Sequence, residues 1–149
     1  MKEEKKEKQV FVDGPITPAF IADSLAKHTT KHSIGAHSMF MGQVRADMNE
    51  NGQTVAAIEY EAYRDMAVQI LHRIREDAFA KYNLTCMHIY HSLGLVKTGE
   101  ISLFVFTSSA HRRPAIEACD YLVERIKKEV QIWGKEILES GGAQWKQPG

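Results

Sequence analysis

Residues 101–128 read ISLFVFTSSAHRRPAIEACDYLVERIKK, an apolar run followed at once by an amphipathic pattern. The run at 101–106 is rich in β-branched and aromatic residues and predicts a strand. From Pro114 to Val130 apolar residues recur every three or four positions, which predicts a helix with one buried face. A helix of this kind, placed directly after an apolar strand, is typical of a domain in which helices pack on a sheet.

The rest of the chain repeats this alternation of strands and helices. A second helix is expected from Thr17, as N-cap, with Pro18 in its first turn, and the clearest helix pattern covers residues 64–82. Further strands are expected at residues 9–12, 34–46, 54–63 and 85–92, with a short last one near Trp145. The turn residues 49–52, NENG, predict that 34–46 and 54–63 form a β-hairpin. The predicted class is α+β, with helices packed on a mostly antiparallel sheet.

Length and composition favour one ordinary globular domain. The chain has 149 residues, and we expect a charged flexible tail at 1–8 and a single domain at 9–149. Lys plus Arg and Asp plus Glu number 19 each, so net charge gives no reason to expect nucleic acid or a membrane as partner. The sequence shows neither a membrane-length apolar run nor a signal peptide, and its two cysteines lack metal-site spacing. These features predict a cytoplasmic protein with reduced thiols.

Basic residues gather around the 114–130 helix. His111 and Arg112 stand at its start, where free N–H groups and the helix dipole attract anions. Lys127 and Lys128 stand near its end, where the dipole favours cations in any case. The grouping predicts a bound anion, although solvated side chains at the helix ends would give the same pattern.

Other chemistry is less well supported. Arg45 closes a predicted strand, a position at which most arginines are simply solvated. His88 and His91 form an H-x-x-H, but on a strand they point to opposite faces, so we expect no metal site. Cys119 lies on the apolar face of the helix and is a poor candidate nucleophile. No glycine-rich segment has the spacing of a nucleotide-binding loop.

Several motifs, in one order over residues 10–145, resemble the large, catalytic subunit of molybdopterin synthase. They are FMGQVR at 40–45, EYEAY at 59–63, HSLGLVKTGE at 91–100, TSSAHR at 107–112, Lys127, and IWGKE at 132–136. The resemblance implies an α/β hammerhead-type fold and a homodimer within a heterotetramer. Its other members would be two copies of a small ubiquitin-like sulfur carrier that ends in a Gly-Gly thiocarboxylate.

The activity that the resemblance implies is sulfur transfer from this thiocarboxylate to cyclic pyranopterin monophosphate. The product is the dithiolene of molybdopterin, and no cofactor is needed because the pterin is the substrate. A non-enzyme is the alternative: a dimeric α+β module that binds a phosphorylated ligand or scaffolds a partner, and turnover would separate the two.

The same resemblance assigns the candidate site. Lys127 is expected to meet the thiocarboxylate and to serve in acid–base steps. The substrate-binding set that it implies is Gln43, Val44, Arg45, His111, Arg112, Lys127, Gly134, Lys135 and Glu136. The family commonly has a second lysine directly after the tryptophan, where this chain has Gly134. Either Lys135 has taken over that catalytic task, or the task is lost.

The length of the helix predicts a site shared between two chains. Arg112 and Lys127 lie fifteen positions apart (127 minus 112), roughly 22 Å along an unbroken helix. One chain therefore cannot place both on one small ligand, whereas a two-fold dimer can. The expected site combines Arg45 and Lys127 of one chain with His111 and Arg112 of its partner.

Overall fold

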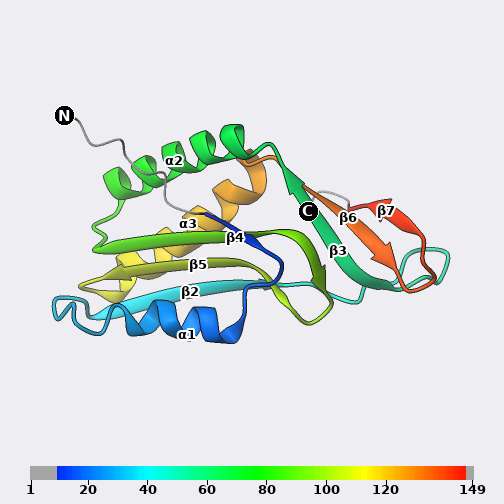
Figure 1. The fold of residues 1–149 in the computed structure, drawn as a ribbon. Helices are drawn as coiled ribbons and strands as arrows, with labels where there is room; N and C mark the ends of the chain where they lie inside the picture. The colour runs from blue at the N-terminus through cyan, green and yellow to red at the C-terminus, as the bar shows by residue number, and fades with distance from the viewer. Residues whose placement is uncertain (1–9, 147–149) are drawn as a thin grey trace, which may run out of the picture.

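The computed structural model describes residues 10–146, so the expected tail at 1–8 lies outside the described residues. Ten elements follow one another along the chain (Figure 1): β1 (Phe11–Asp13), α1 (Pro18–Ala26), β2 (Ala36–Gln43), β3 (Val55–Ala62), α2 (Arg64–Lys81), β4 (Cys86–Lys97), β5 (Ile101–Ser109), α3 (Arg112–Glu129), β6 (Ile132–Leu138) and β7 (Ala143–Trp145).

The seven strands form one sheet in the order β2-β5-β4-β3-β6-β7, with β1 added beside β4. All neighbours are antiparallel except β1 and β4. The long strand β4 joins two regions: its first half pairs with β5, and beyond Gly94 it pairs with β3. Figure 1 shows β3, β6 and β7 as an arm that extends from the helix-covered part of the sheet.

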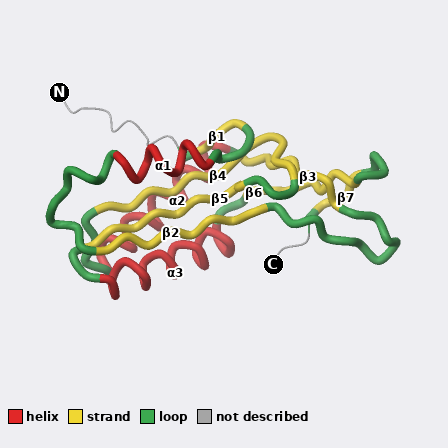
Figure 2. The backbone as a smooth tube through the Cα atoms, turned by 90° about the horizontal axis from the view of Figure 1, so that it is seen from below, coloured by secondary structure: helices red, strands yellow, loops and turns green. Residues whose placement is uncertain are grey.

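Helices cover both faces of the β2-β5-β4 region. On one face, Leu71 and Ile74 of α2 and Leu122 and Ile126 of α3 share a core with Leu103 of β5. On the other face, Phe20 and Ile21 of α1 pack against Ile16, Phe104 and Phe106. Figure 2 shows β2 as the last strand beyond β4 and β5, at the edge of the sheet, with α3 running along it. The start of α3 and its end are thereby held at opposite ends of this edge.

The predicted class and the helices are confirmed. The sheet is mostly antiparallel with packed helices, and α2 and α3 cover the ranges that the periodicity predicts. Thr17 caps α1 as expected, because its Oγ1 accepts a hydrogen bond from the Phe20 N–H at 3.1 Å. No helix within residues 10–146 is long and apolar enough to span a membrane.

The predicted hairpin of 34–46 with 54–63 is wrong. The turn itself forms, since Asn49 Oδ1 accepts hydrogen bonds from the Asn51 and Gln53 N–H groups. Past one isolated bridge the two strands separate: β2 pairs with β5, and β3 pairs with β4 and β6. Local turn chemistry was correct, but each strand finds its partners far away in the sequence.

One strand is longer than predicted, and one strand was not predicted at all. Strand β4 runs on to Lys97, because Gly94, at φ +86°, turns it away from β5 and toward β3. Strand β6 was not predicted. Its sequence IWGKEIL contains a glycine and two charges and begins shortly after α3 ends, so it carries only a weak strand pattern.

Candidate functional site

A cavity of about 380 Å³ lies where the end of α3 meets the arm of the sheet. Its walls include Tyr60 of β3, His91 of β4, Lys127 of α3 and Gly134 of β6, together with Trp145 and Lys146 at the end of β7. No carboxylate is among the described residues that line it. The cavity therefore offers two ammonium groups, a histidine and a phenol, which is a setting suited to an anion.

His91 is buried at the bottom of this cavity with its ring orientation fixed. Its Nδ1 lies 2.7 Å from the Ser92 carbonyl oxygen, so Nδ1 carries the proton and Nε2 is the acceptor of the neutral ring. Burial, and then repulsion by Lys127 and Lys146, lowers the pKa of His91 to about 4. His91 thus stays uncharged at neutral pH and adds no third positive charge.

Tyr60 packs against the His91 ring, with ring centroids 5.1 Å apart in an edge-to-face arrangement. Its hydroxyl donates to Ser102 Oγ at 3.2 Å. Burial raises the pKa of Tyr60, which therefore remains a protonated phenol at neutral pH.

Lys127 reaches the cavity from the last turn of α3, and most of its side chain is exposed. Partial burial of its amine, followed by repulsion from Lys146, lowers the pKa of Lys127. A lysine with reduced proton affinity can release and regain a proton more readily near neutral pH. The geometry thus fits the acid–base role expected for Lys127.

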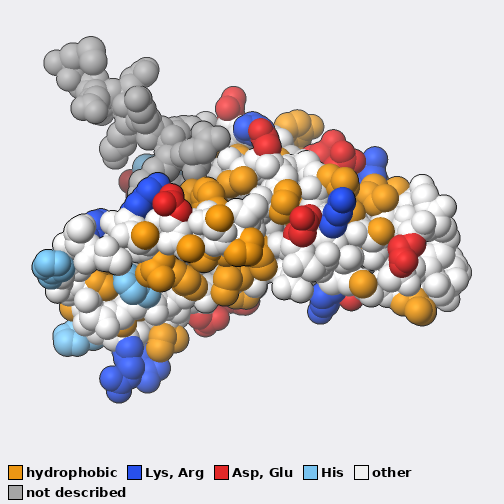
Figure 3. Space-filling view, turned by 60° about the horizontal axis from the view of Figure 1, so that its bottom comes forward, with side chains coloured by type: hydrophobic (Ala, Val, Ile, Leu, Met, Phe, Trp, Pro, Cys, Tyr) orange, Lys and Arg blue, Asp and Glu red, His pale blue; other side chains and the backbone are white. Residues whose placement is uncertain are grey.

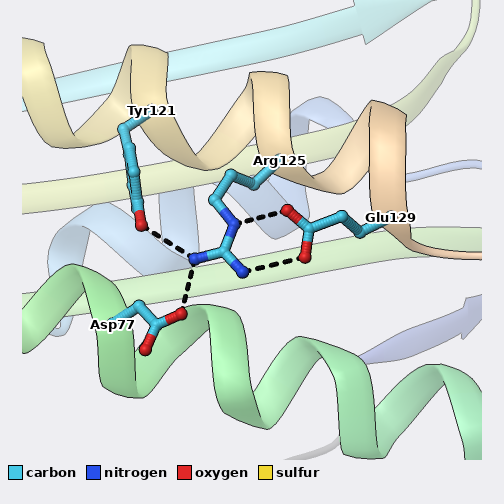
Figure 4. Close-up of polar contacts among 4 residues, drawn as sticks. All are labelled: Asp77, Tyr121, Arg125 and Glu129. Carbon is cyan, nitrogen blue, oxygen red and sulfur yellow. Dashed lines mark hydrogen bonds and ion pairs between the residues drawn. The ribbon is translucent and has the colours of Figure 1, made fainter.

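An arginine cluster fixes the turn of α3 that carries Lys127 (Figure 4). Arg125 binds Glu129 through two hydrogen bonds of 2.6 and 2.8 Å, and its Nη1 reaches Asp77 of α2 at 2.6 Å. The same nitrogen donates to the Tyr121 hydroxyl at 2.8 Å. These charge-assisted contacts raise the pKa of Arg125, lower that of Glu129 and tie α3 to α2 two residues before Lys127.

The candidate residues of β6 point to different faces. Gly134 lines the cavity opposite Tyr60, its partner on β3. Because side chains alternate along a strand, Lys135 lies on the other face, with its Nζ 5.6 Å from the centroid of the Trp145 ring. Glu136 accepts a hydrogen bond from Gln144 at 2.8 Å. The structure does not bring Lys135 into the cavity.

The candidate residues at the end of β2 and just after it differ in their exposure. Gln43 and Arg45 are exposed, and Arg45 forms a 3.2 Å ion pair with Asp47. Val44 is buried against Val55 and Ile58, and its N–H and carbonyl bond Glu100 and Gly99. The expected contact of Val44 with substrate is therefore not supported, because neither its side chain nor its backbone faces outward.

His111 and Arg112 lie at the far end of the molecule from Lys127. His111 is the N-cap residue of α3, and both side chains are exposed. Helix α3 is unbroken from Arg112 to Glu129, so the span of roughly 22 Å to Lys127 holds. One chain therefore separates the expected cations into two groups, one at each end of β2.

The edge strand between these two groups is apolar. Met41 of β2 is 48% exposed, and Met39 and Phe40 are half-buried. Figure 3, with the bottom of Figure 1 turned forward, shows hydrophobic side chains gathered in the middle of this side and a group of Lys and Arg at its lower left. An apolar, unpaired edge is a site for association with another strand.

A second polar cluster lies on the opposite side of the sheet. His28 and His88 approach to 2.9 Å between their Nε2 atoms, and Cys86 lies close to both. Lys31 donates to the Cys86 sulfur at 3.0 Å, so one of the three candidate ligand atoms already has an ammonium partner. His88 and His91 point to opposite faces as predicted, and we assign no metal to this cluster.

Cys119 is buried on α3, and burial raises the pKa of its thiol. This agrees with its exclusion as a nucleophile, since the thiolate is the reactive form.

Sequence reasoning missed three ionisable residues of the cavity as site members: Tyr60, His91 and Lys146. Tyr60 and His91 stand within motifs that the sequence singles out, and strand periodicity could have placed them on one face. Lys146 gives no such signal, because its position depends on how the chain returns after the turn at 139–142.

The buried histidine predicts a loss of stability in mild acid. The unfolded chain has a His pKa near 6.5, whereas the pKa of folded His91 is about 4. Between these values only the unfolded chain binds the proton, so the free energy of unfolding falls as pH falls from 6.5 to 4, by up to about 3 kcal/mol. Urea denaturation of wild type and His91→Gln across this range tests it. A profile equally steep in both proteins would contradict the assignment.

Comparison with known proteins gives a consistent result. The family model described as "MoaE protein" matches residues 15–129. The molybdopterin synthase catalytic subunit of Thermoplasma volcanium is 39% identical over 121 residues, covering 81% of this chain and 87% of the relative. The Bacillus subtilis protein of the same name is 40% identical over 123 residues, covering 83% and 76%.

Solved structures agree with the fold. Molybdopterin synthase from Staphylococcus aureus superposes with a TM-score of 0.81 at 33% identity, covering 97% of this chain and 99% of that one. A complex of subunits 1 and 2 of molybdopterin-converting factor from Helicobacter pylori gives a TM-score of 0.78 at 17% identity, covering 93% and 90%, which shows likeness of fold alone.

Proposed function

The chain belongs to the MoaE family of molybdopterin synthase catalytic subunits, and from this membership we propose how its site works. The protein is a sulfurtransferase of molybdenum cofactor biosynthesis. In our proposal it takes sulfur from the C-terminal thiocarboxylate of a small carrier and delivers it to cyclic pyranopterin monophosphate.

The observation that carries this proposal is the cavity around Lys127. It is cationic, lacks a carboxylate among its described lining residues, and holds an amine of lowered pKa above an uncharged His91. A thiocarboxylate is an anion that must be bound and then released as a carboxylate. Lys127 can bind the anion as an ammonium ion and exchange a proton with the reacting groups.

An aromatic hollow leads to this cavity and suits the tail of the carrier. It is lined by Glu61, Ala62, Tyr63, Trp133 and Trp145, and the two tryptophans also line the cavity. An extended chain that ends in Gly-Gly can lie along these aromatic rings without side chains of its own, so that its terminus reaches Lys127. The Helicobacter pylori neighbour, itself a complex of two subunits, supports a small-subunit partner.

The β2 edge supports a homodimer with a shared site. If two copies pair antiparallel along β2, the Gln43 end of one strand lies beside the Ala36 end of the other. Gly35 bonds Ser109 next to Ala36, so His111 and Arg112 accompany that end. The partner's His111 and Arg112 would then join Gln43, Arg45 and Lys127 around the pterin phosphate, and two carriers would complete a heterotetramer.

A shortened carrier tests the sulfur-transfer proposal. The wild-type protein is supplied with cyclic pyranopterin monophosphate and a thiocarboxylated ubiquitin-like carrier, and dithiolene formation is measured. The same carrier without its last two glycines, thiocarboxylated at its new end, is expected to bind weakly and to donate no sulfur, because its terminus stops short of Lys127. Equal transfer from both carriers would contradict the proposed route, and absence of turnover with the full carrier would favour a binding module.

A further inference from the structure

At Gly134, on the cavity face of β6, neighbouring side chains already fill the position that a side chain would take. A Cβ at this position would lie 2.9 Å from Ile58 Cγ2, too close for the neighbours to remain in place, and 3.5 Å from both Cβ and Cδ of Lys146. The aliphatic part of the Lys146 side chain therefore packs over the Gly134 backbone. The Lys146 N–H donates to the Gly134 carbonyl at 2.7 Å, which fixes this alignment.

Lys146 and Lys127 enter the same cavity from different elements. Lys127 comes from the last turn of α3, and Lys146 directly follows β7. The two charges are close enough to influence their surroundings together: each lowers the pKa of His91, and Lys146 also lowers the pKa of Lys127. Two like charges in one cavity repel each other, and an anion bound between them removes that cost.

Lys135 does not share this arrangement, although it is nearer in sequence to the tryptophan. Its side chain lies on the opposite face of β6 and over the Trp145 ring. Lys135 and Lys146 thus differ in the one property that matters for the site, which is whether the amine faces the cavity.

We propose that Lys146 is the second amine of the active site, contacting the anionic end of the carrier together with Lys127. Its charge binds the thiocarboxylate, and by repulsion it favours the neutral amine of Lys127, which exchanges the proton. This inference rests on the sulfurtransferase function proposed above. It assigns to the chain end after β7 a role that neither Gly134 nor Lys135 can fill.

The test compares Lys146→Met with Lys135→Met, its matched control from the opposite face. Lys146 is exposed and Lys135 is half-buried. Both changes remove one charge and keep an apolar side chain, and both variants are expected to melt within a few degrees of wild type. In single-turnover sulfur transfer, Lys146→Met should lose roughly 100-fold, because the anion loses one of its two charges and Lys127 becomes a poorer acid–base group, whereas Lys135→Met should stay within about twofold. The pH profile of Lys146→Met should also shift upward, because Lys127 regains proton affinity. Lys146→Arg, which keeps the charge, should recover part of the lost rate.

A second readout needs no turnover. The pKa of His91, followed by NMR, should rise from about 4 in Lys146→Met and stay unchanged in Lys135→Met. Equal rates or equal His91 titrations in the two variants would overturn the proposal. If the wild-type protein transfers no sulfur but the His91 pKa still rises in Lys146→Met, the proposed function and the catalytic role are rejected. The placement of Lys146 beside His91 in the cavity then still holds.

Discussion

Replacing Lys127 by alanine is expected to lower sulfur transfer by roughly 100- to 10,000-fold, the range for loss of one acid–base group. Lys127 is the one candidate from the sequence that combines a place in the cavity with a lowered pKa. Lys127 is exposed, so the melting temperature and the proposed dimer should change little. Single-turnover dithiolene formation with thiocarboxylated carrier measures the effect.

Lys128→Ala is the control for this experiment. Lys128 is one residue further along α3 and faces a different hollow, beside Tyr82 and Tyr121. It shares the charge, exposure and helical position of Lys127 but not the cavity, so its loss should change the rate by less than a few fold. Near-normal turnover in Lys127→Ala, or an equal loss in Lys128→Ala, would remove Lys127 from the mechanism.

The helices were predictable because their signals are local. Thr17 and Pro18 mark the start of α1, and α2 and α3 repeat their apolar positions over 18 residues each. Strand pairing is not local. The turn at 49–52 forms as its residues predict, yet β2 and β3 then diverge, β2 to pair with β5 and β3 to pair with β4.

The site was predictable by residue type and only partly by position. The sequence identifies Lys127, Arg45, His111 and Arg112 as candidates, but it cannot show that α3 holds them in two separate groups within one chain. It also favours Lys135 over Lys146, since nearness to Trp133 is visible and the alternation of side chains on the unpredicted β6 is not. In both cases the sequence does not show which segments pair with one another, and this pairing decides where the side chains lie.

Mixing two inactive variants is expected to restore activity if the site is shared between chains. Arg112→Ala should impair the contribution of the partner to a site, and Lys127→Ala the contribution of the chain that holds the cavity. In a mixed dimer one site then carries both defects and the other carries none. Each mixed dimer should have about half of the wild-type activity, and a statistical one-to-one mixture about a quarter.

The control for this complementation is a mixture of Lys127→Ala with Arg45→Ala. Both residues lie at the same end of β2 and are expected to serve the same site from the same chain, so every site in that mixture keeps one defect and activity should stay low. Subunit exchange is verified by differently tagged chains. Recovery in the control mixture would place Arg45 and Lys127 in different sites. Absence of recovery with Arg112→Ala would place His111 and Arg112 outside the site of the partner, because the unbroken α3 already keeps them from reaching Lys127 in their own chain.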